Sequence, residues 1–150
     1  MAEFLFYHLQ NQPLDAVLPA LLTKSLERGW RAVIQVTTEE RLAALDDALW
    51  TYSDESFLAH GTDREAHAAD QPVLLTLSAG NPNGASIRFL VEGADVPEDA
   101  GAYQRLVVLF DGTDLHALAT ARDQWRAVKA QGHDATYWQQ DEGGRWQKKA

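Results

Sequence analysis

Short apolar segments alternate along this chain with longer segments of mixed apolar and polar residues. The short segments, several of them rich in β-branched or aromatic residues, predict strands, and the longer ones predict helices. The expected strands span residues 3–9, 31–36, 71–77, 86–91 and 104–110, and the expected helices end at about residues 28, 50 and 131. This alternation predicts an α/β fold with a parallel or mostly parallel sheet of about five strands, flanked by helices.

Capping residues support the helix boundaries. Gly29 and Gly132 are expected to end the first and last helices. Thr37 and Glu40 have the spacing of a capping box at the start of the second helix. Pro19 lies inside the first helix and removes a backbone donor, so we expect a kink or a later helix start there.

A strong turn signal separates the third and fourth expected strands. Residues 81–84, Asn-Pro-Asn-Gly, favour a tight turn. The two strands could therefore pair as a hairpin, which would give a mixed sheet. With no repeat or linker in the sequence, we expect one domain over residues 1–150, with residues from about 134 to 150 as a candidate for a partly ordered tail.

Length and composition narrow the class of protein. A chain of 150 residues, 45% of them apolar, can bury a full core as one globular domain. No apolar run approaches the ~18–20 residues of a membrane span, and the N-terminus lacks the basic start of a signal peptide. The chain has no cysteine, which excludes disulfides and cysteine-based sites. We therefore expect a cytoplasmic protein without membrane contact.

Charge is distributed unevenly. The net charge is -9, but residues 1–121 contain 7 basic and 18 acidic residues, whereas residues 122–150 contain 6 basic and 4 acidic ones. Strong binding to nucleic-acid phosphates depends on many Lys and Arg contacts, so the acidic total argues against it. The basic character is local to the end of the chain.

Four residues of the last helix form a cationic face with an aromatic residue in it. Arg122, Trp125, Arg126 and Lys129 follow the i, i+3, i+4, i+7 spacing of one helix face. One interpretation is a solvated charged face with a half-buried Trp. The other is a binding site in which guanidinium groups pair with carboxylates while the indole borders a pocket. Such a site would suit the acidic, partly apolar C-terminus of a partner chain.

A second group of aromatic residues follows the second helix. Leu45 and Leu49 have core spacing, Trp50 falls at the helix end, and Phe57 lies in a polar loop. An exposed Trp and Phe would form a protein-contact patch, whereas a buried pair would close the edge of the sheet. The sequence leaves both possibilities open.

Motifs for phosphate binding and hydrolysis are missing from the sequence. The first expected strand is followed by Gln-Asn-Gln-Pro at residues 10–13 rather than by a glycine-rich loop. Neither GxxxxGK[ST] nor GxSxG occurs. We therefore expect no nucleotide cofactor and no hydrolase site.

The remaining candidates for catalysis or metal binding are weak. His60, Asp63 and His67 lie in one loop and could ligate zinc, but no fourth ligand is evident, and solvated loop residues are the simpler interpretation. Asp46 and Asp47 are adjacent and would point about 100° apart on a helix, so they fit a solvated face better than a catalytic pair. The sequence predicts no catalytic residue and no metal.

Four separated segments of the chain carry a family resemblance. They are residues 6–9, residues 29–34, residues 45–50 followed by Ser56, Phe57 and His60, and residues 121–126 followed by Gly132. In order and spacing they resemble the chi subunit family of bacterial DNA polymerase III holoenzyme. Together they cover nearly the whole chain.

The resemblance implies a Rossmann-like, three-layer α/β domain without catalytic activity. It further implies an accessory subunit of the clamp-loader complex that binds the acidic C-terminal tail of single-stranded-DNA-binding protein during DNA replication. Many members also bind a psi subunit by another surface, but no motif here assigns that contact to particular residues.

By position, the resemblance assigns tail binding to Arg122, Trp125, Arg126 and Lys129, together with Trp50. Trp125 stands where the family often has Tyr, and Arg126 where Lys is common. Residues 137–150 are unlike the best-known members, so they are expected to form either an extra wall of the site or a loose end.

Two alternatives come from other functional classes. One is an orphan Rossmann-like enzyme or nucleotide-binding protein that uses the crevice at the carboxyl ends of the strands, with His60 or Asp46. The other is direct binding of single-stranded DNA by the basic helix and Trp residues through stacking, which the acidic remainder of the chain disfavours.

Overall fold

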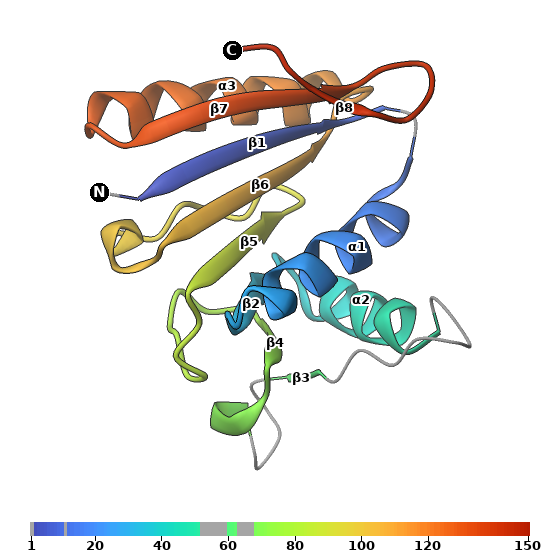
Figure 1. Ribbon diagram of the computed structural model, residues 1–150, viewed down its shortest axis with the longest axis vertical. Helices are drawn as coiled ribbons and strands as arrows, with labels where there is room; N and C mark the ends of the chain where they lie inside the picture. Colours follow the sequence, from blue (N-terminus) through green and yellow to red (C-terminus); the bar gives the residue numbers. More distant parts are fainter. Residues whose placement is uncertain (1, 11, 52–59, 63–67) are drawn as a thin grey trace.

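The computed structural model describes residues 2–10, 12–51, 60–62 and 68–150 (Figure 1). It contains three α-helices, two short 3-10 helices and eight strands in these residues. In chain order they are β1 (Glu3–Leu9), α1 (Leu14–Glu27), β2 (Ala32–Gln35), α2 (Glu39–Thr51), β3 (Gly61–Thr62), η1 (Ala68–Asp70), β4 (Val73–Thr76), β5 (Ile87–Val91), η2 (Ala100–Ala102), β6 (Arg105–Asp111), α3 (Leu115–Ala130), β7 (Asp134–Gln140) and β8 (Trp146–Lys148).

The strands form one sheet in the order β3-β4-β2-β5-β6-β1-β7-β8. All neighbouring strands are parallel except β7 and β8, which are antiparallel. The α/β class and the mostly parallel sheet are therefore confirmed. The expectation of about five strands was wrong, because β3, β7 and β8 also join the sheet. The finer Rossmann-like, three-layer assignment and the single domain stay predictions.

The alternative that was left open, a hairpin around residues 81–84, does not form. β4 and β5 do not pair with each other, because β2 lies between them and pairs in parallel with both. β2 is buried along its whole length, as expected for a strand flanked on both sides and covered on both faces. The sheet is mixed only through β7 and β8.

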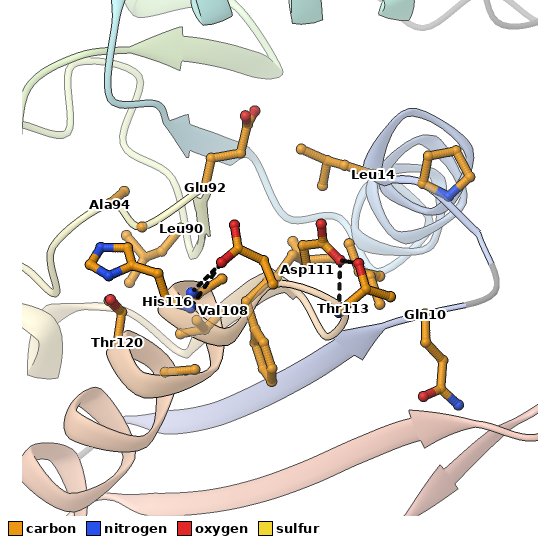
Figure 2. A pocket seen from close by; sticks show the side chains of 18 of the residues that line it. Gln10, Leu14, Leu90, Glu92, Ala94, Val108, Asp111, Thr113, His116 and Thr120 are labelled. Carbon is orange, nitrogen blue, oxygen red and sulfur yellow. Dashed lines mark hydrogen bonds between the residues drawn. The ribbon is translucent and has the colours of Figure 1, made fainter.

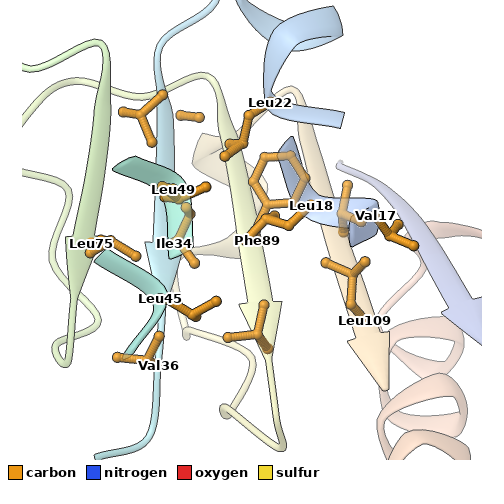
Figure 3. Close-up of a cluster of buried hydrophobic side chains, with 14 of the residues drawn as sticks. Val17, Leu18, Leu22, Ile34, Val36, Leu45, Leu49, Leu75, Phe89 and Leu109 are labelled. Carbon is orange, nitrogen blue, oxygen red and sulfur yellow. The ribbon is translucent and has the colours of Figure 1, made fainter. Parts of the chain in front are cut away.

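The helices cover opposite faces of the sheet. On one face, α1 and α2 pack with the sheet around a cluster that Figure 3 shows, which includes Leu18, Leu22, Leu45, Leu49, Ile34 and Phe89. On the other face, α3 contributes Ala121 and Val128 to a second cluster with Phe4, Phe6 and Val108. Because side chains alternate along a strand, β1 sends Phe4 and Phe6 to the α3 face and Leu9 to the other.

The starts of α1 and α2 differ in detail from those expected from the sequence. α1 starts after Pro13 and continues through Pro19, so no later start occurs. At α2, the N–H of Arg41 donates to Thr38 Oγ1 at 3.1 Å, so Thr38, rather than the expected Thr37, accepts a hydrogen bond at this helix start.

Among the described residues, no helix combines the length and the apolar character needed to cross a membrane.

Candidate functional site

Helix α3 carries the cationic face that the sequence predicted. Its first turn is capped by Asp114, whose carboxylate accepts the N–H groups of His116 and Ala117. Buried Ala121 and Val128 hold the helix against the sheet. The predicted cations therefore fall on the outer side of the helix, in a position fixed by its packed side.

Arg122, Arg126 and Lys129 are all exposed to solvent. We call these three residues the cationic face. Arg126 lies 4.0 Å from Asp123, and the side chains of both are about four-fifths exposed, at 78% and 80%. A pair this exposed neutralises little charge. Among the described residues, no ion pair involves Arg122 or Lys129 within 4.0 Å, so these cations remain available to an incoming anion.

Trp125 is half-buried at the edge of the cationic face. Its ring packs edge-on against Phe6, with centroids 5.3 Å apart, and against Tyr137 at 6.2 Å. Lys129 Nζ lies 5.5 Å from the centroid of the indole. One side of the indole is thus anchored in the core while a cation stands beside the ring.

A cavity of about 430 Å³ opens beside Trp125, between α3 and the strands beneath it. Its lining is mostly apolar or aromatic and is formed by His8, Phe110, Leu118, Ala121, Arg122, Trp125, Tyr137 and Ala150. We call this cavity the α3 pocket. It combines an apolar interior with the exposed guanidinium of Arg122, the combination needed to hold an apolar side chain that carries or adjoins a carboxylate.

Burial favours the neutral forms of the two polar side chains inside the α3 pocket, His8 and Tyr137. Tyr137 OH and His8 Nδ1 are 2.5 Å apart. Burial lowers the pKa of the His8 imidazole, and the Asp111 carboxylate offsets this only in part. Burial raises the pKa of the Tyr137 phenol more than the charge of Arg122 lowers it. Arg122 is therefore the charged side chain of the pocket lining.

An exposed apolar side chain lies on the same side of the helix. Leu115, the first residue of α3, is 83% exposed. It lies three residues before Leu118 and seven before Arg122, so the three share one helix face. A large apolar side chain this exposed is compatible with a contact to a partner.

The structure does not bring residue 50 to the α3 pocket. It lies in the last turn of α2, and α2 packs with α1 on the face of the sheet opposite α3. The side chain of Trp50 and all of Phe57 lie outside the described residues. Their predicted contact patch stays a prediction.

His60 is buried instead of lying in a solvated loop. Its Nε2 lies 2.9 Å from Asp46 Oδ1, and the histidine side chain is fully buried. This contact ties the chain beside β3 to α2 and gives both residues a structural role. Asp63 and His67, the other two residues of this weak metal candidate, lie outside the described residues, and no cluster of metal-binding side chains occurs within the described ones.

A larger cavity, of about 880 Å³, lies at the carboxyl ends of β1, β5 and β6, beside the starts of α1 and α3 (Figure 2). Nucleotides often bind at this position in α/β sheets. Its lining includes apolar Leu14 and Val108 and the carboxylates of Asp15, Glu92, Asp111 and Asp114. Arg41 also lines it and pairs with Glu92 at 2.8 Å, so the other three carboxylates set its charge. We call it the acidic crevice.

The acidic crevice is poorly suited to a phosphate. The N-cap of α1 is Pro13, which has no N–H, and Asp114 already accepts the amides of His116 and Ala117 at the start of α3. Asp111 accepts the N–H and hydroxyl of Thr113, which lowers the pKa of its carboxyl group and keeps it charged. The dashed lines of Figure 2 show these bonds. The amides at the start of α3, a position that commonly binds anions, are thus occupied by the Asp114 carboxylate.

The sequence did not reveal the strand side of the α3 pocket. His8, Phe110 and Tyr137 come from β1, β6 and β7, which are adjacent only because of the strand order. The aromatic residues near the end of the sequence were the one available signal. The cations and the indole, by contrast, follow from helical spacing alone.

This chain is similar to proteins of one known family. A family profile described as "DNA polymerase III chi subunit, HolC" matches residues 1–136. A curated protein of Rickettsia prowazekii (strain Madrid E), named "Probable DNA polymerase III subunit chi", is 28% identical over 117 residues, which cover 74% of this chain and 71% of that protein. The family match includes all of α3 and ends within β7.

Proposed function

This chain belongs to the family of the DNA polymerase III chi subunit, and from that membership we propose that it links the clamp-loader complex to single-stranded-DNA-binding protein. In this proposal it is a non-catalytic accessory subunit that binds the acidic C-terminal tail of that protein during DNA replication. The supporting observation is the α3 pocket, where an apolar cavity adjoins exposed, positively charged Arg122.

The tail would place its carboxylates and its terminal apolar side chain in different environments. Arg122, Arg126 and Lys129 would pair with the carboxylates, and the apolar side chain would enter the α3 pocket against Trp125. Exposed ion pairs contribute only ~0–1 kcal/mol each. Burial of the apolar side chain must therefore supply much of the affinity, while the charges set orientation and association rate.

We expect a dissociation constant of about a micromolar, or about -8 kcal/mol, for so small a site. Such weak binding is sufficient if the partner is an oligomer that presents several tails, because tethered sites raise the effective concentration. Trp50, which the family resemblance also assigns to tail binding, belongs to α2, whose backbone packs on the opposite face of the sheet, and its part in tail binding stays a prediction. Attachment to the clamp loader, through a psi subunit where one exists, would use another surface.

The experiment is a titration with a synthetic acidic peptide that ends in Phe, followed by Trp fluorescence at low and moderate salt. We expect saturable binding that weakens with salt. A peptide amidated at its C-terminus and one with Asn in place of Asp should each bind less well. No response to millimolar peptide would contradict the proposal.

The same protein serves to test the nucleotide-binding alternative. Thermal unfolding in the presence of nucleotides or divalent metals would show a raised midpoint if either bound the folded state. Because the Asp114 carboxylate occupies the amides at the start of α3 and further carboxylates line the acidic crevice, we expect no such stabilisation by nucleotides.

A further inference from the structure

One wall of the α3 pocket is formed by residues that lie beyond the family match. The family profile ends at residue 136, whereas Tyr137 and Ala150 line the pocket. Tyr137 comes from β7, and Ala150 follows β8. The segment 137–150 therefore adds surface to this site that the family resemblance does not account for.

A tight turn brings the end of the chain back to the pocket. Asp141 Oδ1 accepts the N–H groups of Gly143 and Arg145, each at 2.9 Å, and the N–H of Asp141 donates to the carbonyl of Arg145. Gly144 takes a positive φ of 80°, which glycine adopts without strain. The turn allows β8 to pair with β7 in antiparallel register.

The returning strand holds Tyr137 from its outer edge. The N–H of Lys149 donates to the Tyr137 carbonyl at 2.7 Å, and the N–H of Tyr137 donates to the carbonyl of Ala150 at 3.3 Å. On the inner side, the Tyr137 hydroxyl lies beside His8, and its ring packs on Trp125 and Phe110. Tyr137 is thus fixed from both sides.

The outer edge of β7 is consequently occupied at the pocket. A bound peptide cannot extend the sheet by pairing with Tyr137, because both backbone groups of this residue are already bonded. The peptide must instead be recognised through the side chain that enters the cavity. That cavity is bordered by the rings of Trp125, Phe110 and Tyr137, which favour edge-to-face contact with another flat ring.

We propose that Tyr137, held by the β7–β8 hairpin, is a specificity-determining residue of the peptide site and selects an aromatic over an aliphatic side chain at the end of the bound peptide. This inference rests on the proposed tail binding. It assigns to residues 137–150 a role in choosing the ligand, beyond completing the sheet.

The test compares two acidic peptides that differ only in a terminal Phe or Leu. For the unmodified protein we expect the Phe peptide to bind roughly three- to tenfold more tightly, the range that one aromatic pair supplies. In Tyr137→Leu this preference should fall to within about twofold. Tyr137→Phe, which keeps the ring, should retain it.

Trp138→Leu is the matched control. Trp138 is the next residue of β7, and its ring stacks on Tyr7 rather than lining the α3 pocket. If Tyr137→Leu acted only by weakening β7, Trp138→Leu would lose the preference for Phe as well. We expect instead that the preference persists in Trp138→Leu. An equal loss in both variants would overturn the proposal.

A second variant avoids changing the core. Asp141→Ala removes the acceptor that closes the turn and should reduce the preference for Phe while leaving the pocket residues in place. If neither Tyr137→Leu nor Asp141→Ala changes the ratio of the two affinities, the selectivity role is wrong and tail binding stands. If the unmodified protein binds neither peptide, the proposed function itself fails.

Discussion

The two cavities beside α3 share Phe110 and Ala121 in their linings, yet they carry opposite charge. The acidic crevice has the larger volume and the position expected of a nucleotide site, but its carboxylates and its occupied helix amides make it unfavourable for anions. The α3 pocket is smaller and has exposed Arg122 at its edge. Cavity size and place in the fold are therefore weaker guides to the ligand than the charges that remain unneutralised.

A close contact connects the two cavities. His8 lines the α3 pocket, and Gly112 lies in the turn between Asp111 and Thr113, which line the acidic crevice. A Cβ atom on Gly112 would lie 1.9 Å from His8 Nε2, too close for any side chain. Glycine at this position thus allows the crevice turn to pack directly on the pocket wall.

Among the variants considered, removal of the Trp125 indole should have the largest effect on the affinity of the α3 pocket for an acidic peptide. Trp125→Ala should weaken binding of the acidic peptide by about thirtyfold or more, since a half-buried aromatic beside a cation has the character of a binding hot spot. Calorimetric titration measures this without relying on Trp fluorescence.

Trp30→Ala provides the comparison for this variant. Trp30 is also half-buried, but it packs on the α1 face beneath Arg28 and Arg105. Its loss should leave peptide affinity within about twofold, because it touches neither cavity. Equal losses for the two tryptophans would mean that Trp125 acts only through stability.

A side chain at residue 112, where the two cavities meet, should lower the free energy of unfolding. Gly112→Ala forces the His8 ring away from its place beside Tyr137, and overpacking of this kind costs about 1–3 kcal/mol in the free energy of unfolding. Urea denaturation measures the loss. His8→Ala combined with Gly112→Ala should recover part of it, whereas additive effects would show that the two residues are not coupled.

Much of the fold could be predicted from the pattern of apolar residues, because most strands are buried on both faces. β2 and β6 have continuous apolar runs and were predicted close to their observed bounds. β7 was missed because most of its residues are only half-buried, so its sequence shows no apolar run. β3 has two residues, which is too few for any periodic signal.

The candidate site, like the fold, could be predicted only in part. Spacing along one helix placed Arg122, Trp125, Arg126 and Lys129 together without knowledge of the fold. The opposite wall depends on β6, β1 and β7 being neighbours, an order that local sequence does not specify. Grouping Trp50 with the last helix relied on family resemblance, and the described backbone places its helix on the other face.

Removing a charge at the α3 pocket should weaken peptide binding more than removing one at the acidic crevice. Arg122→Ala should weaken acidic-peptide binding by about two- to fivefold at low salt, the equivalent of one exposed ion pair, and by less at high salt. Asp15→Asn, at the edge of the acidic crevice, should change the affinity by less than about twofold, since its charge acts only at long range. Arg145→Ala, an exposed cation in the β7–β8 turn, controls for net charge; a loss equal to that of Arg122→Ala would show that only net charge matters.

The smallest effect should appear in the titration of His8, because both cavities act on the same imidazole. Burial against the α3 pocket lowers its pKa, while the Asp111 carboxylate of the acidic crevice raises it, and burial is the larger influence. The folded protein therefore binds a proton at His8 less readily than the unfolded chain does. The stabilising effect of neutral His8 is complete above the unfolded pKa of about 6.5 and declines as the pH falls through it. Asp111→Asn should lower the pKa of His8 further, which a proton NMR titration of the imidazole would detect; an unchanged or raised pKa would show that the crevice carboxylate does not act across the contact at Gly112.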